Sequence, residues 1–311
     1  MKVYINRFPV LGPWGGGSKV LAAVIYELGV RGHSLSSDLN DADAYFCFDP
    51  RKSGIHADYQ TLYAISRQRN KPLIQRVGDL GTHGKPELTE FLKKNLAKSD
   101  LLIFPSEYAR DYLKDEFDIR KSIVIPNGPM KCFYERRNEN LNPQTETLKI
   151  VTHHWSLNPK KGFPVYEYFD KATSFLESKF SMTYIGRLPD GLSFRQIDYR
   201  PPMNAQELAS ILPTFDVYLT ASEDEAGANH VLEAAAAGLP IVCSALGGSI
   251  PEYCHEFGAV YGSYNPSLFE CLAHVRKNYQ SYKTSVLKYN RTVNDCAREI
   301  VEAMIEITSQ R

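Results

Sequence analysis

Short apolar runs alternate with amphipathic stretches along the 311-residue chain. The apolar runs have the length and the polar boundaries of buried strands, and they occupy residues 1–6, 44–48, 71–74, 101–104, 216–220 and 239–243. Elsewhere, apolar residues recur at helical spacing, at 20–28, 228–237 and 294–307. Strands that alternate with helices predict an α/β protein.

One sequence phrase, an Asp followed directly by the apolar residues of a buried strand, recurs at 42–48, 99–104 and 215–219. Its recurrence predicts two similar sheet domains. It also explains Asp41 and Asp43 as residues at the entry of a strand, although their spacing is that of an Asp-x-Asp metal site. We therefore assign no metal.

A domain boundary is predicted near residues 126–147. Pro126 to Pro129 have the composition of a turn, and residues 136–147 are polar and charged, as linkers are. We expect a first domain over 1–130, a linker over 131–147 and a second domain over 148–289.

Composition excludes some classes of partner. Lysine plus arginine equals aspartate plus glutamate, at 36 each, so no global field attracts the chain to nucleic acid. The six cysteines include no Cys-x-x-Cys pair, which favours reduced thiols in a cytoplasmic protein. The first strand lacks an apolar signal core, so secretion is not expected. The longest weakly polar stretch, 231–250, carries Glu233 and Pro240, which argues against a membrane span but leaves contact with the inner face of a membrane open.

Residues 222–252 carry the most informative chemistry. Glu225 and Glu233 flank a small turn, 227–229, that opens an alanine-rich helix after a strand. A strand, a turn and a helix in this order present backbone N–H groups that bind anions, above all phosphate. Carboxylates beside a phosphate are explained if they accept hydrogen bonds from the sugar and ribose hydroxyls of a nucleotide sugar. The alternative makes Glu225 a solvated loop charge and Glu233 an ordinary residue of a helix surface.

This segment resembles the donor-site signature of family-4 retaining glycosyltransferases of the GT-B fold. In that signature a Ser-x-x-Glu turn precedes a second Glu eight positions on, an Ala-rich helix, Gly-x-Pro, and Gly-Gly-x-x-Pro-Glu. The matching residues are Ser222, Glu225, Glu233, Gly238, Pro240, Gly247, Gly248, Pro251 and Glu252. The departure lies at 226–228, where Ala-Gly-Ala stands in place of the common Gly-aromatic-Gly.

The resemblance implies an α/β GT-B protein with two Rossmann-like domains whose parallel sheets face each other across a cleft. Residues 125–128 match the Ile-Pro-Asn-Gly phrase at which similar enzymes pass from the first domain to the second. In the family the last helix commonly returns to the first domain, so residues 290–311 are expected to complete the domain formed by 1–130.

The resemblance extends to a phosphate-binding loop at the start of the second domain. The family has Arg, four residues and then Lys-Gly, with both cations on the donor diphosphate. Lys161 matches, but Ser156 stands where Arg is expected. Either a neutral contact from Ser156 or His154 suffices, or Arg187 compensates from the next strand. Because adjacent strand residues face opposite sides, His153 and His154 are expected to be one core and one cleft histidine rather than a metal site.

Two loops of the first domain are further candidates. The glycine-rich turn before the first helix includes Gly16 and Gly17, and in similar enzymes such a turn contacts the acceptor or the donor phosphate; a tight turn without a ligand is the alternative. Arg76, Asp79 and His83 follow a strand, at the sheet edge where α/β proteins bind ligands. They are candidates for the transferred sugar or the acceptor, although an exposed loop Asp and His need no function.

The resemblance implies transfer of a sugar, with retention, from a nucleotide-diphosphate sugar to a hydroxyl of a glycan, a lipid-linked or a small-molecule acceptor, without metal or other cofactor. Glu233 would bind ribose, Glu225 the sugar, and Lys161 the leaving diphosphate. The turn residues expected at the diphosphate are Gly227, Ala228 and Asn229. Two alternatives are a GT-B-fold nucleotide-sugar epimerase, with Asp79 and His83 as its acid/base pair, and a nucleotide-sugar-binding protein with a degraded site.

Overall fold

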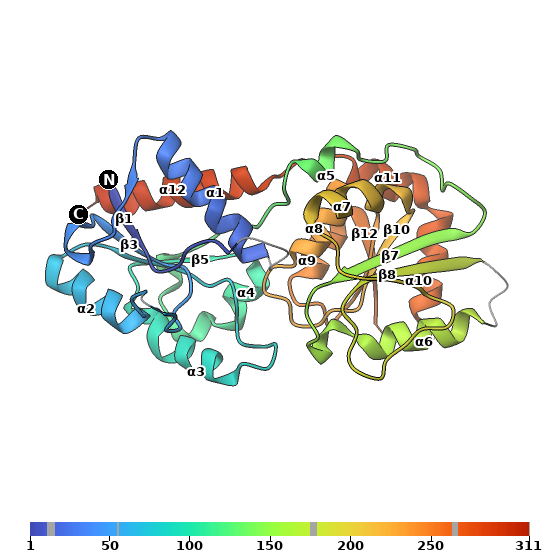
Figure 1. The fold of residues 1–311 in the computed structure, drawn as a ribbon, viewed down its shortest axis with the longest axis horizontal. Helices are drawn as coiled ribbons and strands as arrows, with labels where there is room; N and C mark the ends of the chain where they lie inside the picture. Colours follow the sequence, from blue (N-terminus) through green and yellow to red (C-terminus); the bar gives the residue numbers. More distant parts are fainter. Residues whose placement is uncertain (11–15, 55, 175–178, 263–266, 311) are drawn as a thin grey trace. The chain divides into compact units, whose positions relative to one another are not determined.

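The structure is a computed structural model that describes residues 1–10, 16–54, 56–174, 179–262 and 267–310 (Figure 1). The chain forms two compact units: Met1–Gly128 with Thr292–Arg311, and Pro129–Arg291. Each unit contains a six-stranded sheet in which all strand pairs are parallel. The predicted α/β fold with two Rossmann-like sheets is confirmed.

The first unit has the strand order β2-β1-β3-β4-β5-β6. Its strands are β1 Lys2–Ile5, β2 Ser34–Leu35, β3 Ala44–Cys47, β4 Leu73–Arg76, β5 Leu101–Phe104 and β6 Ser122–Val124. Its α-helices are α1 Gly16–Val30, α2 Tyr59–Arg69, α3 Pro86–Asn95, α4 Glu107–Tyr112 and α12 Val293–Ser309, with short 3-10 turns at Leu39–Asp41, Leu96–Lys98, Lys114–Glu116 and Ile119–Lys121.

Helix α12, from the end of the chain, packs against α1 in the first unit (Figure 1). Thr292 caps the start of the helix. Its hydroxyl accepts a hydrogen bond from the backbone N–H of Asp295, and the Asp295 carboxylate accepts from the backbone N–H of Thr292. The buried face of the helix includes Ile300 and Met304, at helical spacing. Segments from both ends of the chain therefore build one hydrophobic core.

The second unit has the strand order β12-β11-β10-β7-β8-β9. Its strands are β7 Leu148–His154, β8 Phe180–Gly186, β9 Asp198–Arg200, β10 Val217–Thr220, β11 Ile241–Ser244 and β12 Gly258–Tyr261. Its α-helices are α5 Cys132–Glu135, α6 Phe163–Thr173, α7 Ala205–Ile211, α8 Asn229–Ala236, α9 Ile250–Phe257, α10 Ser267–Lys277 and α11 Tyr279–Val286, with 3-10 turns at Pro159–Lys161 and Leu212–Thr214. The strand order reverses between β7 and β10, and ligands of doubly wound sheets bind at such a switch point.

The core of the second unit explains two sequence features. Helix α8 is rich in small residues, and Ala234 to Ala237 are fully buried, which lets the helix lie close to the sheet. Gly238 ends it in the left-handed region, with φ 83°. Within the stretch 131–147, α5 contributes the buried Phe133 to the same core.

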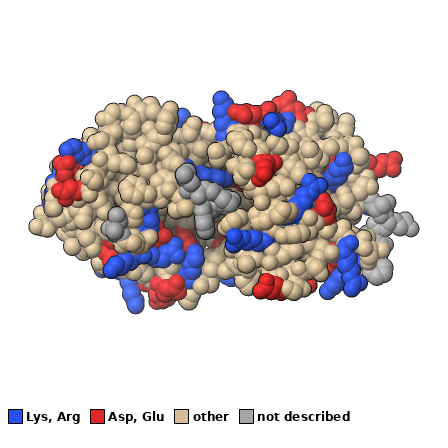
Figure 2. Space-filling model, viewed as in Figure 1, with Lys and Arg blue, Asp and Glu red and all other residues tan. Residues whose placement is uncertain are grey.

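The distribution of charges and the state of the cysteines agree with the composition. On the face shown in Figure 2, basic and acidic side chains are interspersed over each unit. The cysteines are free, and all except the half-buried Cys271 are buried. Among the described helices, none combines the length and the apolar character that crossing a membrane requires.

Candidate functional site

The donor residues predicted in the second domain come together at the carboxyl ends of β7 and β10, on either side of the switch point of the second sheet. His153 and His154 end β7, and the segment that carries Glu225 follows β10 and leads into α8. Lys161 ends the 3-10 turn that follows β7. Residues distant in the sequence thus share one edge of the sheet.

Lys161 and Glu225 form an ion pair between the Lys161 Nζ and a Glu225 carboxylate oxygen. Their side chains are only 11% and 13% exposed. The solvated-charge alternative for Glu225 is therefore wrong. The loop of Lys161 lies tightly against the end of β10. A Cβ at Gly162, where φ is 77°, would stand only 2.3 Å from the carbonyl oxygen of Ala221.

The Gly-Gly phrase holds the Glu225 turn in place. Glu225 and Gly248 form an isolated parallel bridge, and the backbone N–H of Ser249 donates to the Glu225 carbonyl at 2.8 Å. Gly248 has φ 67°, and a Cβ there would stand 2.6 Å from both the backbone N and O of Glu225. Only glycine fits this close approach without displacing the turn.

Glu233 lies on α8 and is buried, with 5% of its surface exposed. Its Oε2 is 3.0 Å from Nε2 of His153 on β7. The alternative that Glu233 is a helix-surface residue is wrong. Sequence reasoning missed His153 as its partner, and the only available signal was the position of His153 at the end of a buried strand.

The two adjacent histidines point to opposite faces of β7, as strand geometry requires. His153 contacts α8, whereas Nε2 of His154 is 2.7 Å from the hydroxyl of Tyr166 on α6 and 3.0 Å from the hydroxyl of Thr152. The expectation of one core and one cleft histidine is wrong, because both rings are buried. Burial, with His230 and Lys161 nearby, lowers the pKa of His154 well below its usual value. His154 is therefore neutral near pH 7 and does not supply a cation.

Ser156 and Arg187 lie on neighbouring loops. The Ser156 hydroxyl accepts a hydrogen bond from the backbone N–H of Asn158 at 3.1 Å. Arg187 follows β8, is exposed, and stacks its guanidinium 4.0 Å from the centre of the Trp155 ring. Its backbone N–H donates to the His154 carbonyl at 3.3 Å. Of the three residues considered as substitutes for the expected Arg, which are Ser156, His154 and Arg187, only Arg187 carries a charge near pH 7.

The small turn places three further candidates at the start of α8. Asn229 is its first residue, Ala228 is its N-cap, and the half-buried Gly227 precedes the cap. The side chain of the N-cap residue Ala228 makes no capping hydrogen bond. The first backbone N–H groups of a helix have no carbonyl one turn earlier to bind, and such groups bind anions.

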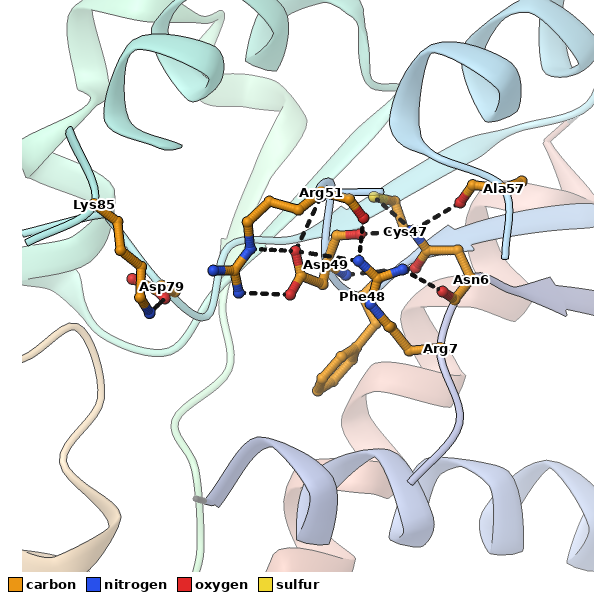
Figure 3. A network of polar contacts seen from close by, with 9 residues as sticks. All are labelled: Asn6, Arg7, Cys47, Phe48, Asp49, Arg51, Ala57, Asp79 and Lys85. Atoms are coloured by element: carbon orange, nitrogen blue, oxygen red, sulfur yellow. Dashed lines mark hydrogen bonds and ion pairs between the residues drawn. The ribbon is translucent and has the colours of Figure 1, made fainter. Parts of the chain in front are cut away.

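In the first unit, Asn6 joins the ends of β1 and β3 at the corresponding switch point (Figure 3). Its Nδ2 donates to the Asp49 carbonyl at 2.6 Å, and its Oδ1 accepts from the backbone N–H of Phe48 at 2.8 Å. Gly16 and Gly17 form the start of α1, and a Cβ at Gly17 would stand 3.6 Å from the Phe48 ring. The preceding part of the glycine-rich turn, 11–15, lies outside the described residues.

The three acceptor-side candidates of the first unit lie in different environments. Arg76 ends β4, is buried, and donates to the Asn127 side chain. Asp79 pairs with Lys85 at 2.5 Å (Figure 3) and accepts from the backbone N–H of Gly81 at 2.9 Å. His83 is half-buried in the turn that follows. Arg76 thus joins the end of β4 to Asn127, whereas Asp79 joins two residues of its own loop.

Across the described ranges, no group of three or more His, Cys, Asp and Glu side chains is arranged to hold a metal ion. Asp41 pairs instead with Lys2 at 2.7 Å, and Asp43 accepts from the backbone N–H of Lys2 at 2.8 Å. Both residues act at the entry of the sheet, as the repeated sequence phrase predicts.

Comparison with known proteins identifies the fold. No protein-family model matches the sequence, and no curated protein matches it. Among solved structures, the chain is similar to a glycosyltransferase from Rickettsia africae, with a TM-score of 0.66, 13% identity and coverage of 100% of this chain and 99% of the other. It is similar to WaaG, a glycosyltransferase involved in lipopolysaccharide biosynthesis, with a TM-score of 0.62, 13% identity and coverage of 100% and 98%. It is also similar to Anabaena HepE solved in complex with UDP, with a TM-score of 0.62, 13% identity and coverage of 99% and 97%. The predicted GT-B fold is confirmed.

Proposed function

We propose that this protein is a retaining glycosyltransferase that moves a hexose from a nucleotide-diphosphate sugar to a hydroxyl acceptor, without metal or other cofactor. The observation that carries the proposal is the position of the Glu225–Lys161 pair and of the buried Glu233 at the switch point of the second sheet. The GT-B fold and a similar structure that contains UDP support a nucleotide donor.

The site residues have separate roles in this proposal. Glu233 accepts hydrogen bonds from the ribose hydroxyls and Glu225 from the transferred sugar. Lys161 and the first-turn N–H groups of α8 neutralise the charge that develops on the diphosphate as the bond from the anomeric carbon to the phosphate oxygen breaks. Because a cation and a helix N-terminus supply this stabilisation, the step needs no metal.

Retention follows if the acceptor hydroxyl attacks the face from which the diphosphate leaves. The anomeric carbon then passes through an oxocarbenium-like state, and the acceptor proton moves to the leaving phosphate oxygen. No nucleophile from the protein is required. We assign the donor to the domain formed by 148–289 and the acceptor to the first domain. Arg76, Asp79 and His83 are the candidates for the acceptor or the transferred sugar, and Gly16 and Gly17 are candidates for binding the donor.

A panel of UDP-, GDP- and ADP-sugars tests the proposal, first by thermal shift and then by nucleotide release with and without an acceptor. A transferase stabilised by one donor releases nucleotide when an acceptor is supplied. An epimerase converts the donor without an acceptor, and a binding protein gives a thermal shift without turnover. Unchanged product formation in EDTA and the same anomeric configuration in donor and product, read by NMR, test metal independence and retention.

A further inference from the structure

The His153–Glu233 pair has a role that the transfer reaction does not by itself require. Nε2 of His153 and Oε2 of Glu233 are 3.0 Å apart, and the side chains are 9% and 7% exposed. A buried carboxylate is strongly unfavourable without a partner, so this contact compensates Glu233 within the protein. Where the carboxylate is ionised it only accepts, and the donor in this contact is then Nε2 of His153.

His153 is itself held in one orientation. Its backbone N–H donates to the hydroxyl of the fully buried Tyr218 at 3.2 Å, and that hydroxyl donates to the His153 carbonyl at 3.3 Å. The imidazole meets the Tyr218 ring edge to face at 5.4 Å and the His230 ring at 6.2 Å. Among the described residues, Nδ1 of His153 has no hydrogen-bond partner, so the polar contact of the ring is the one to Glu233.

The direction of the Glu233 carboxylate is therefore set by a ring that the sheet holds fixed. A carboxylate accepts through two oxygens at about four lone-pair sites, so a bond to histidine is compatible with bonds to two vicinal hydroxyls. Such two-point recognition requires the carboxylate plane to be fixed, because a group that rotates freely loses entropy on binding.

We propose that His153 is a positioning residue that aims Glu233 at the ribose of the nucleotide, and that through it the site selects ribonucleotides over 2′-deoxyribonucleotides. This inference rests on the proposed function, which assigns Glu233 to the ribose. His153 touches the carboxylate and not the reacting atoms, so its removal affects recognition of the nucleotide rather than bond cleavage.

The test compares His153→Leu, which removes the donor, with His153→Gln, whose amide reaches the position of Nε2, and His153→Asn, whose shorter amide does not. The probes are the tightest-binding of UDP, GDP and ADP and its 2′-deoxy counterpart, measured by calorimetry. We measure the dissociation constant of the deoxynucleotide divided by that of the ribonucleotide. This ratio should fall about tenfold in His153→Leu and His153→Asn, which is the size of one lost net hydrogen bond. In His153→Gln it should keep its wild-type value. Affinity for the deoxynucleotide should fall by a smaller factor, because it keeps only one of the two hydroxyls that Glu233 contacts, whereas misfolding would weaken binding of both nucleotides equally.

Glu233→Gln supplies a second measurement if His153→Leu does not fold, because it weakens the same ribose contact from the other partner. In turnover, the His153 variants should raise KM with little change in kcat, as expected for a contact made equally in the ground and transition states. An unchanged ratio in His153→Asn and His153→Leu, or a wild type that binds both nucleotides equally, overturns the inference and leaves the transferase proposal standing. A wild type that binds none of the three nucleotides overturns both.

Discussion

The Lys161 ammonium and the Glu225 carboxylate lie in direct contact at the switch point of the second sheet, with side chains 11% and 13% exposed. The proposed reaction needs one of these groups at the diphosphate and the other at the sugar, which are adjacent parts of one donor. Their contact compensates two shielded charges within the protein. Donor binding would exchange this ion pair for contacts with phosphate and with sugar hydroxyls.

Removing the charge of Lys161 should abolish most transfer. Lys161→Ala deletes the cation that acts on the leaving diphosphate in the proposed reaction, and the loss of one such group typically lowers kcat by about 10²–10³. Initial rates of nucleotide release, with the donor identified in the panel, measure the effect. Glu225→Gln should lower the same rate by a similar factor, because it weakens the contact with the sugar.

Lys160→Ala is the matched control for Lys161→Ala. Lys160 is the sequence neighbour, and its ammonium pairs with Asp224 on the same two loops. Its side chain is 38% exposed, so the pair contributes about 1 kcal/mol or less. Equal losses in the two lysine variants would contradict a specific role for Lys161.

Gly248→Ala should impair the donor site through the backbone. The added Cβ would stand 2.6 Å from Glu225 N and O, so the turn that carries the carboxylate must move. Gly191→Ala is the control, because Gly191 also has positive φ, at 81°, but nothing lies within 4 Å of its Cβ position. We expect Gly248→Ala to lower both the melting temperature and donor affinity, and Gly191→Ala to cost about 1 kcal/mol of stability with affinity intact. Equal donor affinity in the two variants would show that the contact between Gly248 and the turn does not contribute to donor binding.

Arg187 is expected to act on the diphosphate in place of the missing Arg. Arg187→Gln removes the charge stacked on Trp155. It should weaken binding of the nucleoside diphosphate roughly tenfold and leave the nucleoside monophosphate nearly unchanged, in line with a hydrogen bond to a charged group. Calorimetry with both nucleotides measures the ratio, and equal weakening of the two would assign Arg187 to another part of the donor.

Stability should fall in mild acid because of the histidines at the switch point. Burial lowers the pKa of His154 well below 6.5, and burial lowers the pKa of the half-buried His230 to about 3. The unfolded chain binds protons at these positions as the pH falls below about 6.5, and the folded protein does not. The contribution of these histidines to the free energy of unfolding is therefore fully present above this pH. It is lost as the pH falls toward the folded pKa values, by up to about 1.4 kcal/mol per pH unit for each histidine.

Urea unfolding between pH 7 and pH 5 measures this slope. His154→Gln should flatten it, because glutamine does not titrate, whereas His255→Gln at the exposed end of α9 should leave it unchanged. A slope that is the same in wild type and His154→Gln would show that the lost stability comes from other groups.

The sequence by itself determined the elements and the loops that carry the chemistry. Apolar spacing predicted α1 and α12, and polar boundaries predicted β3, β5 and β10, because the period of a helix or strand is a local property of the backbone. The end of α8 at Gly238 and the small turn before α8 could also be predicted from the sequence, because helix ends depend on few neighbouring residues.

Only the tertiary structure decided what each charged group contacts. His153 and Glu233 are separated by 80 residues, and Lys161 and Glu225 by 64. Parallel strand order brings them to one edge of the sheet. Burial then turned Glu233 from an ordinary helix residue into a paired carboxylate and made His154 neutral. These outcomes depend on desolvation and on partners from other elements, and a local sequence pattern does not contain either.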